Sequence, residues 1–145
     1  MAITSAICTS FKVELSKGTH NFTATTGNTF KIALYDSDAT LGAGTTAFTT
    51  SEEITNTSGT AYTSGGATLT SVTPVADSTT AVCDFADVSF SSATFTANGA
   101  LIYNSSATNA AVAAIAFGSD KTATNGTFTI QFPAADASNA IIRLA

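Results

Sequence analysis

His20 is the only histidine in the chain, so few residues could do chemistry. A metal site made of two or three imidazoles from one chain is therefore excluded. A Ser-His-Asp triad would have to use His20, and no serine lies in a Gly-x-Ser-x-Gly turn. We expect His20 at a surface or turn position, and we expect no enzyme activity.

Two pairs of aspartates lie close in the sequence, Asp36 with Asp38 and Asp84 with Asp87. Such pairs could give oxygen ligands to Ca²⁺ or share a proton between two carboxyl groups. Asp-Ser-Asp in a turn is explained more simply by side chains that cap backbone amides, while a calcium site stays an open alternative. We expect no cofactor, because no phosphate-binding glycine motif is present and Gly65-Gly66 indicates a turn.

The cysteines and tyrosines offer little more chemistry. Cys8 and Cys83 are the only cysteines, and we expect both to be buried thiols, with a disulfide as the alternative. A carbohydrate-binding module usually presents exposed Trp or Tyr side chains to the sugar. The chain has no Trp and only Tyr35, Tyr62 and Tyr103, which disfavours carbohydrate binding.

Composition excludes two further classes of partner. The 145 residues fit one domain, with 10 acidic and 5 basic side chains and a net charge of -5. The basic residues are scattered, which disfavours nucleic acid and anionic membranes. No apolar run approaches the roughly 20 residues that cross a bilayer, and no secretory signal is apparent, so we expect synthesis and assembly in a cytoplasm. With 28 Thr and 16 Ser, the surface is predicted to be rich in hydroxyl groups.

The elements that must position these residues begin with a helix predicted over residues 4–17. Its apolar residues recur every four positions: Ile3, Ile7, Phe11 and Leu15. Thr4 or Ser5 could cap its start, and Gly18 is expected to end it. The apolar stripe docks either on the protein's own core or on a neighbouring subunit.

After Gly18 the hydrophobic period changes from four to two, which predicts seven to nine short strands. Residues 29–36, 110–117 and 127–132 are the clearest, and Asn98-Gly99 suits either a hairpin turn or a bulge. Residues 49–66 are expected to form a long loop with one helical turn. The pattern predicts an all-β, antiparallel β-sandwich or jelly-roll-like fold, with residues 1–18 as an amino-terminal helix or arm and residues 19–145 as one domain.

Several residues are candidates for contact with another subunit or partner. Lys31 and Tyr35 are expected to point outward from the strand at 29–36, opposite its apolar face. Ile141 and Arg143 are expected to point outward from the last strand. The amino-terminal stripe is the first candidate for an anchor and the carboxy-terminal strand the second. The full set of candidates is Ile3, Ile7, Phe11, Leu15, Lys31, Tyr35, Ile141 and Arg143.

Seven stretches of the chain are specific as a set and together span nearly the whole sequence. The stretches are Ala-Ile-Cys-Thr-Ser-Phe-Lys at 6–12, Gly-Thr-His-Asn-Phe at 18–22, Thr-Phe-Lys-Ile-Ala-Leu-Tyr at 29–35, Ala-Thr-Leu-Gly at 39–42, Gly-Thr-Ala-Tyr-Thr-Ser-Gly-Gly at 59–66, Gly-Ala-Leu-Ile-Tyr-Asn at 99–104, and Gly-Thr-Phe-Thr-Ile-Gln-Phe-Pro at 126–133. As a set they resemble a family of small virion structural proteins of tailed bacteriophages.

The resemblance implies a place in a phage particle and supplies no catalytic residues. The leading expectation is a capsid decoration (cement) protein on the outer surface of the capsid, which binds the major capsid protein and forms a homotrimer at threefold positions. The alternative is a tail or fibre component, including a receptor-binding module that contacts the host surface. A third alternative is a tail-tube or baseplate component.

Overall fold

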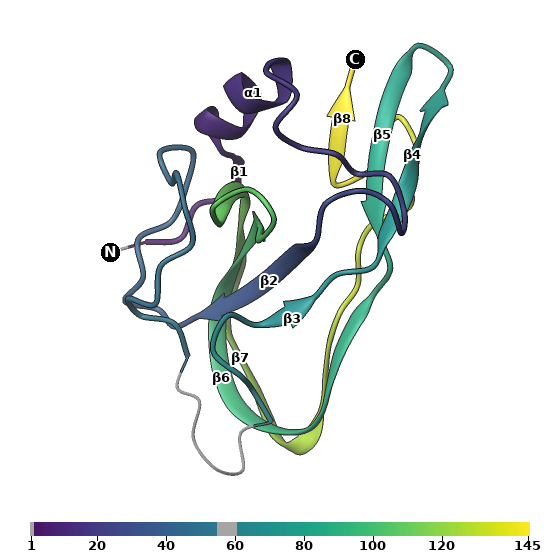
Figure 1. The fold of residues 1–145 in the computed structure, drawn as a ribbon. Helices are drawn as coiled ribbons and strands as arrows, with labels where there is room; N and C mark the ends of the chain where they lie inside the picture. Colours follow the sequence, from purple (N-terminus) through teal and green to yellow (C-terminus); the bar gives the residue numbers. More distant parts are fainter. Residues whose placement is uncertain (1, 55–60) are drawn as a thin grey trace.

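The computed structural model describes residues 2–54 and 61–145, whose strands form two antiparallel sheets that share one core (Figure 1). This confirms the predicted antiparallel β-sandwich with one amino-terminal helix. The five-stranded sheet has the order β1-β7-β6-β2-β3, and the three-stranded sheet has the order β4-β5-β8. The elements are β1 (Ala6–Ile7), α1 (Thr9–Ser16), β2 (Phe30–Tyr35), β3 (Ala67–Thr68), β4 (Ser71–Asp77), β5 (Thr80–Phe85), β6 (Val88–Asn104), β7 (Ala110–Ile130) and β8 (Ile142–Leu144).

One long hairpin, β6 with β7, connects the two sheets. It is paired from Val88 opposite Ile130 to Asn104 opposite Ala110. Figure 1 shows that this ribbon bends sharply at the bottom of the view, so that one arm lies beside β2 and the other rises toward β5. The sequence predicted two separate strands at 110–117 and 127–132; instead they are parts of the same β7, and the ribbon bends between them.

Asn98-Gly99 lies inside β6, at one of the register shifts of the hairpin. The shift falls between Ala97, which pairs with Lys121, and Gly99, which pairs with Ala116. The hairpin turn is therefore wrong for Asn98-Gly99, and the register shift beside it is a bulge or another irregularity whose additional residues lie on β7. Bulges and similar irregularities increase the local twist and bend of a ribbon, as the bend of the β6–β7 hairpin requires.

The amino-terminal helix is shorter than predicted, because the residues before it belong to the sheet. The amide of Thr4 donates to the carbonyl of Leu41, and Ala6–Ile7 pairs with β7 as strand β1. The residue that precedes α1 is Cys8, which makes no side-chain cap, so the predicted start at residue 4 and the cap by Thr4 or Ser5 are wrong. Pairing with the sheet satisfies backbone amides that would otherwise form hydrogen bonds within a longer helix.

The helix ends as predicted. Gly18 adopts a φ of +74°, and the amides of Gly18 and Thr19 donate to the carbonyls of Leu15 and Glu14. This is the Schellman arrangement, in which a left-handed glycine lets the chain turn back over the last helical carbonyls. The turn carries the chain from α1 toward β2, and His20 and Phe22 follow it into the interior.

The loop that follows β2 is only partly described. Residues 51–52 form a turn rather than a helix, and residues 55–60, where the rest of the expected helical turn falls, lie outside the described residues. Gly65 and Gly66 have φ values of +90° and +78°, which confirms the predicted turn. This turn brings β3 against β2, where Ala67 pairs with Ile32.

Candidate binding grooves

His20 is buried, so its predicted surface or turn position is wrong. Its Nε2 lies 2.8 Å from Oε2 of Glu14, and its Nδ1 lies 3.0 Å from Nδ2 of Asn104. The amide nitrogen of Asn104 can only donate, so Nδ1 accepts from it and Nε2 donates to the carboxylate of Glu14. Since both ring nitrogens are occupied, His20 has none left to activate a nucleophile.

Aromatic rings surround this histidine on the core side. The centroid of its ring lies 4.8 Å from that of Phe11 and 6.3 Å from that of Phe30. Asn104, which is fully buried, extends the polar contacts by donating to Oδ1 of Asn28 at 3.0 Å. The hydrogen bonds from Glu14 through His20 and Asn104 to Asn28 therefore form a satisfied network, buried at His20 and Asn104, that joins α1, the loop before β2, and β6.

The acidic residues form turns and one surface cluster. Oδ1 of Asp36 accepts from the amide of Asp38 at 2.9 Å, which confirms the predicted capped turn. Glu52 joins them, and one carboxylate oxygen from each of the three residues lies within 4.8 Å of the others. Asp38 and Glu52 are exposed, and solvated carboxylates commonly cluster without a cation, so we assign no metal site here.

One member of the second aspartate pair, Asp87, has a structural role. Asp87 accepts from the amide of Phe132 at 2.8 Å and thereby fixes the segment after β7. Asp84, on β5, has a buried Oδ1 without a hydrogen-bond partner among the described residues. Within the described ranges, neither carboxyl group belongs to a cluster that could hold a cation.

Both cysteines are buried free thiols, as predicted. Burial raises the pKa of the Cys8 and Cys83 thiols. A thiol with a raised pKa is a poor nucleophile at neutral pH, because the reactive form is the thiolate. The cysteines therefore belong to the core rather than to a reactive site.

All three tyrosines are buried, so none can stack on a sugar at the surface. Tyr35 is fully buried and its hydroxyl donates to the carbonyl of Thr49 at 2.7 Å, so its predicted outward position is wrong. Residues 52–54 pair with the edge of β2, where Glu53 bridges to Tyr35 and the amide of Ile54 donates to the carbonyl of Leu34. Burial raises the pKa of all three phenols, that of Tyr103 to about 12.

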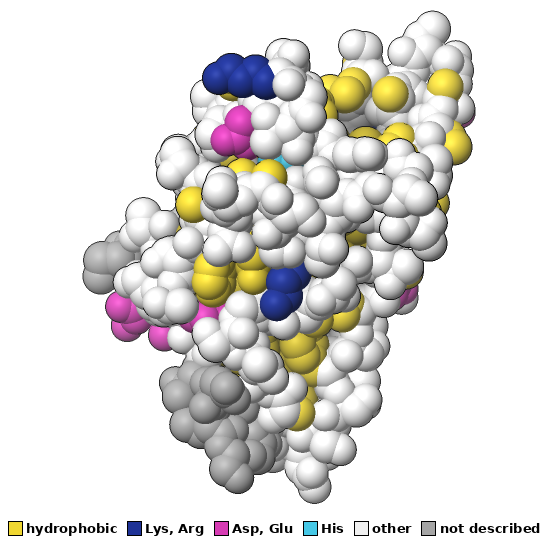
Figure 2. Space-filling view, in the orientation of Figure 1, with side chains coloured by type: hydrophobic (Ala, Val, Ile, Leu, Met, Phe, Trp, Pro, Cys, Tyr) yellow, Lys and Arg dark blue, Asp and Glu magenta, His cyan; other side chains and the backbone are white. Residues whose placement is uncertain are grey.

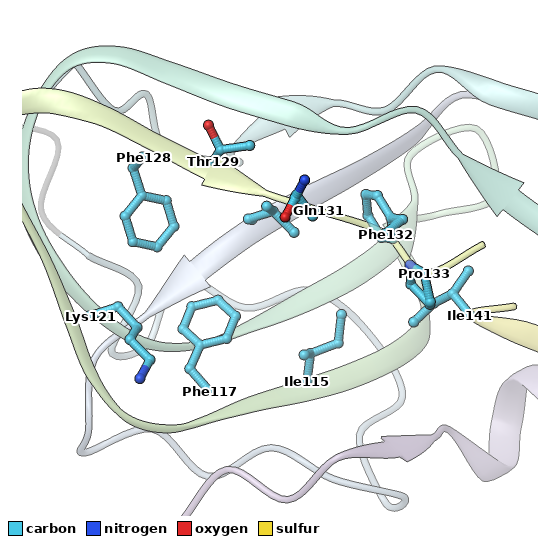
Figure 3. A pocket seen from close by; sticks show the side chains of 10 residues that line it. Ile115, Phe117, Lys121, Phe128, Thr129, Gln131, Phe132, Pro133 and Ile141 are labelled. Atoms are coloured by element: carbon cyan, nitrogen blue, oxygen red, sulfur yellow. The ribbon is translucent and has the colours of Figure 1, made fainter. Parts of the chain in front are cut away.

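An apolar groove, here the β7 groove, lies inside the bend of β7 (Figure 3). Its volume is about 500 Å³. Ile115 and Phe117 from one arm and Phe128 from the other point into it, and Lys121 stands at one end (Figure 3). Phe132, Pro133 and Ile141 close the other end, so Ile141 lies in a groove rather than on an open strand face. Each of these strands could be predicted from the sequence, but the groove arises only from the bend.

A second groove, the α1–β8 groove, lies between the helix and the last strand and has a volume of about 470 Å³. Figure 1 shows α1 on one side of β8 and β5 on the other. The groove brings together four of the eight predicted interface residues. Its lining is Ile7, Phe11, Lys12, Leu15, Ser16, Ile142, Arg143 and Leu144. The two candidate segments at opposite ends of the sequence therefore form one surface.

The remaining candidates are separated from this groove. Ile3 forms an isolated bridge with Leu41 and packs partly buried against the core. Lys31 is half-buried on β2, which β3 and β6 flank on its two edges. Tyr35 is interior, and Ile141 lies in the β7 groove.

Most of the surface in Figure 2 is neither charged nor apolar, in keeping with the content of Thr and Ser. Basic side chains on this face lie over α1 at the top and near the centre, and most of the acidic side chains in view gather at the left. In the described part of the chain, no helix has the length and apolarity that crossing a membrane requires. Comparison with protein-family models, curated proteins and solved structures found no match for this chain.

Proposed function

We propose that this chain is a non-enzymatic structural protein of a tailed-bacteriophage virion. In this proposal it decorates the outer surface of the capsid as a homotrimer and stabilises the head by binding the lattice of major capsid protein. The observation that carries the proposal is the α1–β8 groove, where Ile7, Phe11, Leu15 and Arg143 meet. The sequence pattern indicates each of these four residues as an interface candidate, and the fold gathers them on one surface.

The chemistry of the other residues supports a binding role over a catalytic one. His20 has both ring nitrogens engaged, and burial raises the pKa of both thiols. The β7 groove is lined mostly by apolar side chains, and Lys121 is the one charged residue among the described residues of its lining, so it is a surface for binding rather than for proton transfer. A shell protein needs many identical weak contacts, and apolar grooves on a rigid sandwich provide them.

The first test is the number of copies per particle. Purified virions are analysed by quantitative mass spectrometry against the major capsid protein. Decoration of the shell predicts a ratio between about one third and about one, because a decorating oligomer follows the symmetry of the lattice. A ratio of a few per cent would favour the tail or fibre alternative, and absence from particles would overturn the virion proposal.

A second test addresses the groove directly. Leu144 lines the groove and is 49% exposed, whereas Val75 on β4 is 55% exposed and lines neither groove. Leu144→Glu should weaken binding to capsids stripped of this protein at least about tenfold, because a charge would be buried at the contact. Val75→Glu, the matched control, should bind like the unmodified protein. Equal binding by both variants would remove the groove from the contact.

A further inference from the structure

We infer that the α1–β8 groove takes an extended strand of a partner protein, which adds to the free edge of β8 and carries carboxylate side chains among apolar ones. This inference rests on the proposed function, because it specifies how the contact with the capsid is made. The structural basis is the position of β8 at the edge of its sheet, the apolar lining of the groove, and the charges at its rim.

Strand β8 has a neighbour on one side only. It pairs with β5 through Ile142 opposite Cys83, Arg143 opposite Val82, and Leu144 opposite Ala81. The three-stranded sheet has the order β4-β5-β8, so the opposite edge of β8 has no strand beside it among the described residues. An unpaired edge presents backbone donors and acceptors that a further strand can satisfy.

The space beside this edge is apolar on both sides. Helix α1 contributes Phe11 and Leu15, while β8 contributes Ile142 and Leu144. Leu144 is half exposed, so it has apolar surface that a partner could still cover. Alternate side chains of an added strand would point toward the helix, because successive side chains of a strand face opposite ways.

The size of the groove favours an extended peptide segment over a folded protein surface as its occupant. Its volume of about 470 Å³ lies within the range of roughly 300–1,000 Å³ typical of sites that enclose ligand-sized groups. A globular surface would touch only the rim. A single extended segment can place a few side chains inside and keep its backbone against β8.

The charges of the groove indicate which side chains that segment carries. Lys12 and Arg143 line the groove, and no carboxylate from the described residues lines it. The ion pair found in the described part of the chain joins Glu14 to His20, so neither Lys12 nor Arg143 is paired with a carboxylate there. Arg143 donates to the neutral carbonyls of Ala137 and Ser138, and it interacts electrostatically with the carboxylate of Asp136, with which it forms no ion pair.

One acidic residue near the rim is already engaged. The carboxylate of Asp136 accepts from the side chain of Asn139 and from the amide of Ser138. Lys17, at the end of α1, adds a further exposed cation on the helix side. A strand that carries carboxylates is therefore favoured over a basic one, although the chain as a whole has a net charge of -5.

The test uses short synthetic peptides and the full chain. One peptide alternates Ile with Glu, and its charge-reversed counterpart alternates Ile with Lys. Both are N-methylated along one edge, so that they cannot assemble with themselves but can still pair with β8. Binding is measured by titration, and hydrogen exchange locates it. We expect the Ile/Glu peptide to bind at least about tenfold tighter than the Ile/Lys peptide and to slow exchange at residues 142–144.

Variants and a modified peptide separate backbone pairing from charge. The double variant Lys12→Glu/Arg143→Glu should bind the Ile/Lys peptide more tightly than the Ile/Glu peptide. The control Lys121→Glu, in the β7 groove, should keep the original preference. A peptide N-methylated along both edges should lose binding. Equal binding of the two peptides, protection elsewhere in the chain, or no binding would overturn the inference. The copy number on virions is measured independently of these peptide results. The inference can therefore fail while the proposed function stands, and the proposed function can fail while the peptide still binds.

Discussion

At the scale of single residues, the buried polar groups stabilise the protein rather than carry out a reaction. Asn104 is the centre of the network: it donates to His20 and Asn28, and its side-chain oxygen accepts from the amide of Ser106. Each of these partners would lose a hydrogen bond if Asn104 were removed. A buried group without a partner costs more free energy than the bond itself contributes.

Asn104→Ala should therefore lower the free energy of unfolding by about 1–3 kcal/mol, since the buried ring of His20 loses a hydrogen bond in the interior. Urea denaturation followed by circular dichroism measures this change. Asn98→Ala is the matched control, because Asn98 donates to Asp120 at the surface. Its effect should be within about 0.5 kcal/mol. Similar losses for the two variants would contradict the role assigned to Asn104.

The buried tyrosines predict a loss of stability at high pH. The pKa of Tyr103 is raised to about 12 in the folded protein, above the value of about 10 in an unfolded chain. Below pH 10 the phenol is protonated in both states. Between pH 10 and 12 the unfolded chain releases the proton while the folded chain retains it, so stability falls.

Urea midpoints measured from pH 7 to 11 should thus be nearly constant below about pH 9 and fall above about pH 10. Tyr103→Phe should be less stable at neutral pH, because the hydroxyl donates to the carbonyl of Gly65, but its decline above pH 10 should be shallower. An unchanged slope in this variant would show that the phenol of Tyr103 does not contribute.

At the scale of elements, the amino-terminal segment is part of the sandwich. Strand β1 pairs with β7, and α1 buries Phe11 against His20 and Phe22. Phe11 is 1% exposed, whereas Val13 on the same helix is 52% exposed. The apolar stripe thus has one residue that the core requires and neighbours, such as Leu15, that remain partly accessible in the groove.

Phe11→Ala should cost about 3–5 kcal/mol of unfolding free energy, as expected for removing a large buried aromatic side chain. Val13→Ala should change it by less than about 0.5 kcal/mol. Thermal and urea unfolding of both variants test this contrast. A small effect of Phe11→Ala would mean that α1 can detach without disturbing the sheet.

Glycine at position 66 is required by the contact between β2 and β3. A Cβ atom there would lie 1.8 Å from the carbonyl oxygen of Ile32, and its φ of +78° is also unfavourable for other residues. Gly66→Ala should therefore unfold the protein or shift its urea midpoint strongly downward. Gly44→Ala is the control, since nothing lies within 4 Å of a Cβ at that position. Comparable midpoints for both variants would refute this packing.

At the scale of the whole molecule, the two sheets share one core and should unfold together. Cys8 precedes α1 and Cys83 lies on β5, and both belong to the same cluster of buried residues. In single-cysteine variants made by Cys8→Ala or Cys83→Ala, the remaining thiol should become reactive at the same urea concentration. Labelling of one thiol well before the other would show that the sheets separate before global unfolding.

The class of fold and most strands could be predicted from the sequence because local patterns determine them. The alternation at 29–36 and the glycine at position 18 act through nearest neighbours, and both predictions are confirmed. Ile3 and Ile7 fit a helical period, yet pairing with distant Leu41 and β7 decides their conformation. The outward positions predicted for His20 and Tyr35 are wrong because other segments fold over them: α1 and Asn104 contact His20, and the hydroxyl of Tyr35 donates to Thr49.

The candidate site could be predicted only in part. The sequence indicates Ile7, Phe11, Leu15 and Arg143 of the α1–β8 groove one by one. Their meeting depends on the order of strands in both sheets, which no local pattern encodes. The β7 groove could not be predicted, because alternation indicates which residues share a strand face but not where a ribbon bends.

Pairing of β1 with β7 also sets the order in which the protein can be completed during synthesis. Ala6 leaves the ribosome before its partner Ala114, which emerges only after β6 and the turn that follows it. The β6–β7 hairpin has partners near in sequence and can form as soon as it emerges, whereas β1 must wait for it. Until then β1 has no partner strand, so the nascent chain exposes the apolar side chain of Ile7 while the intervening residues are synthesised.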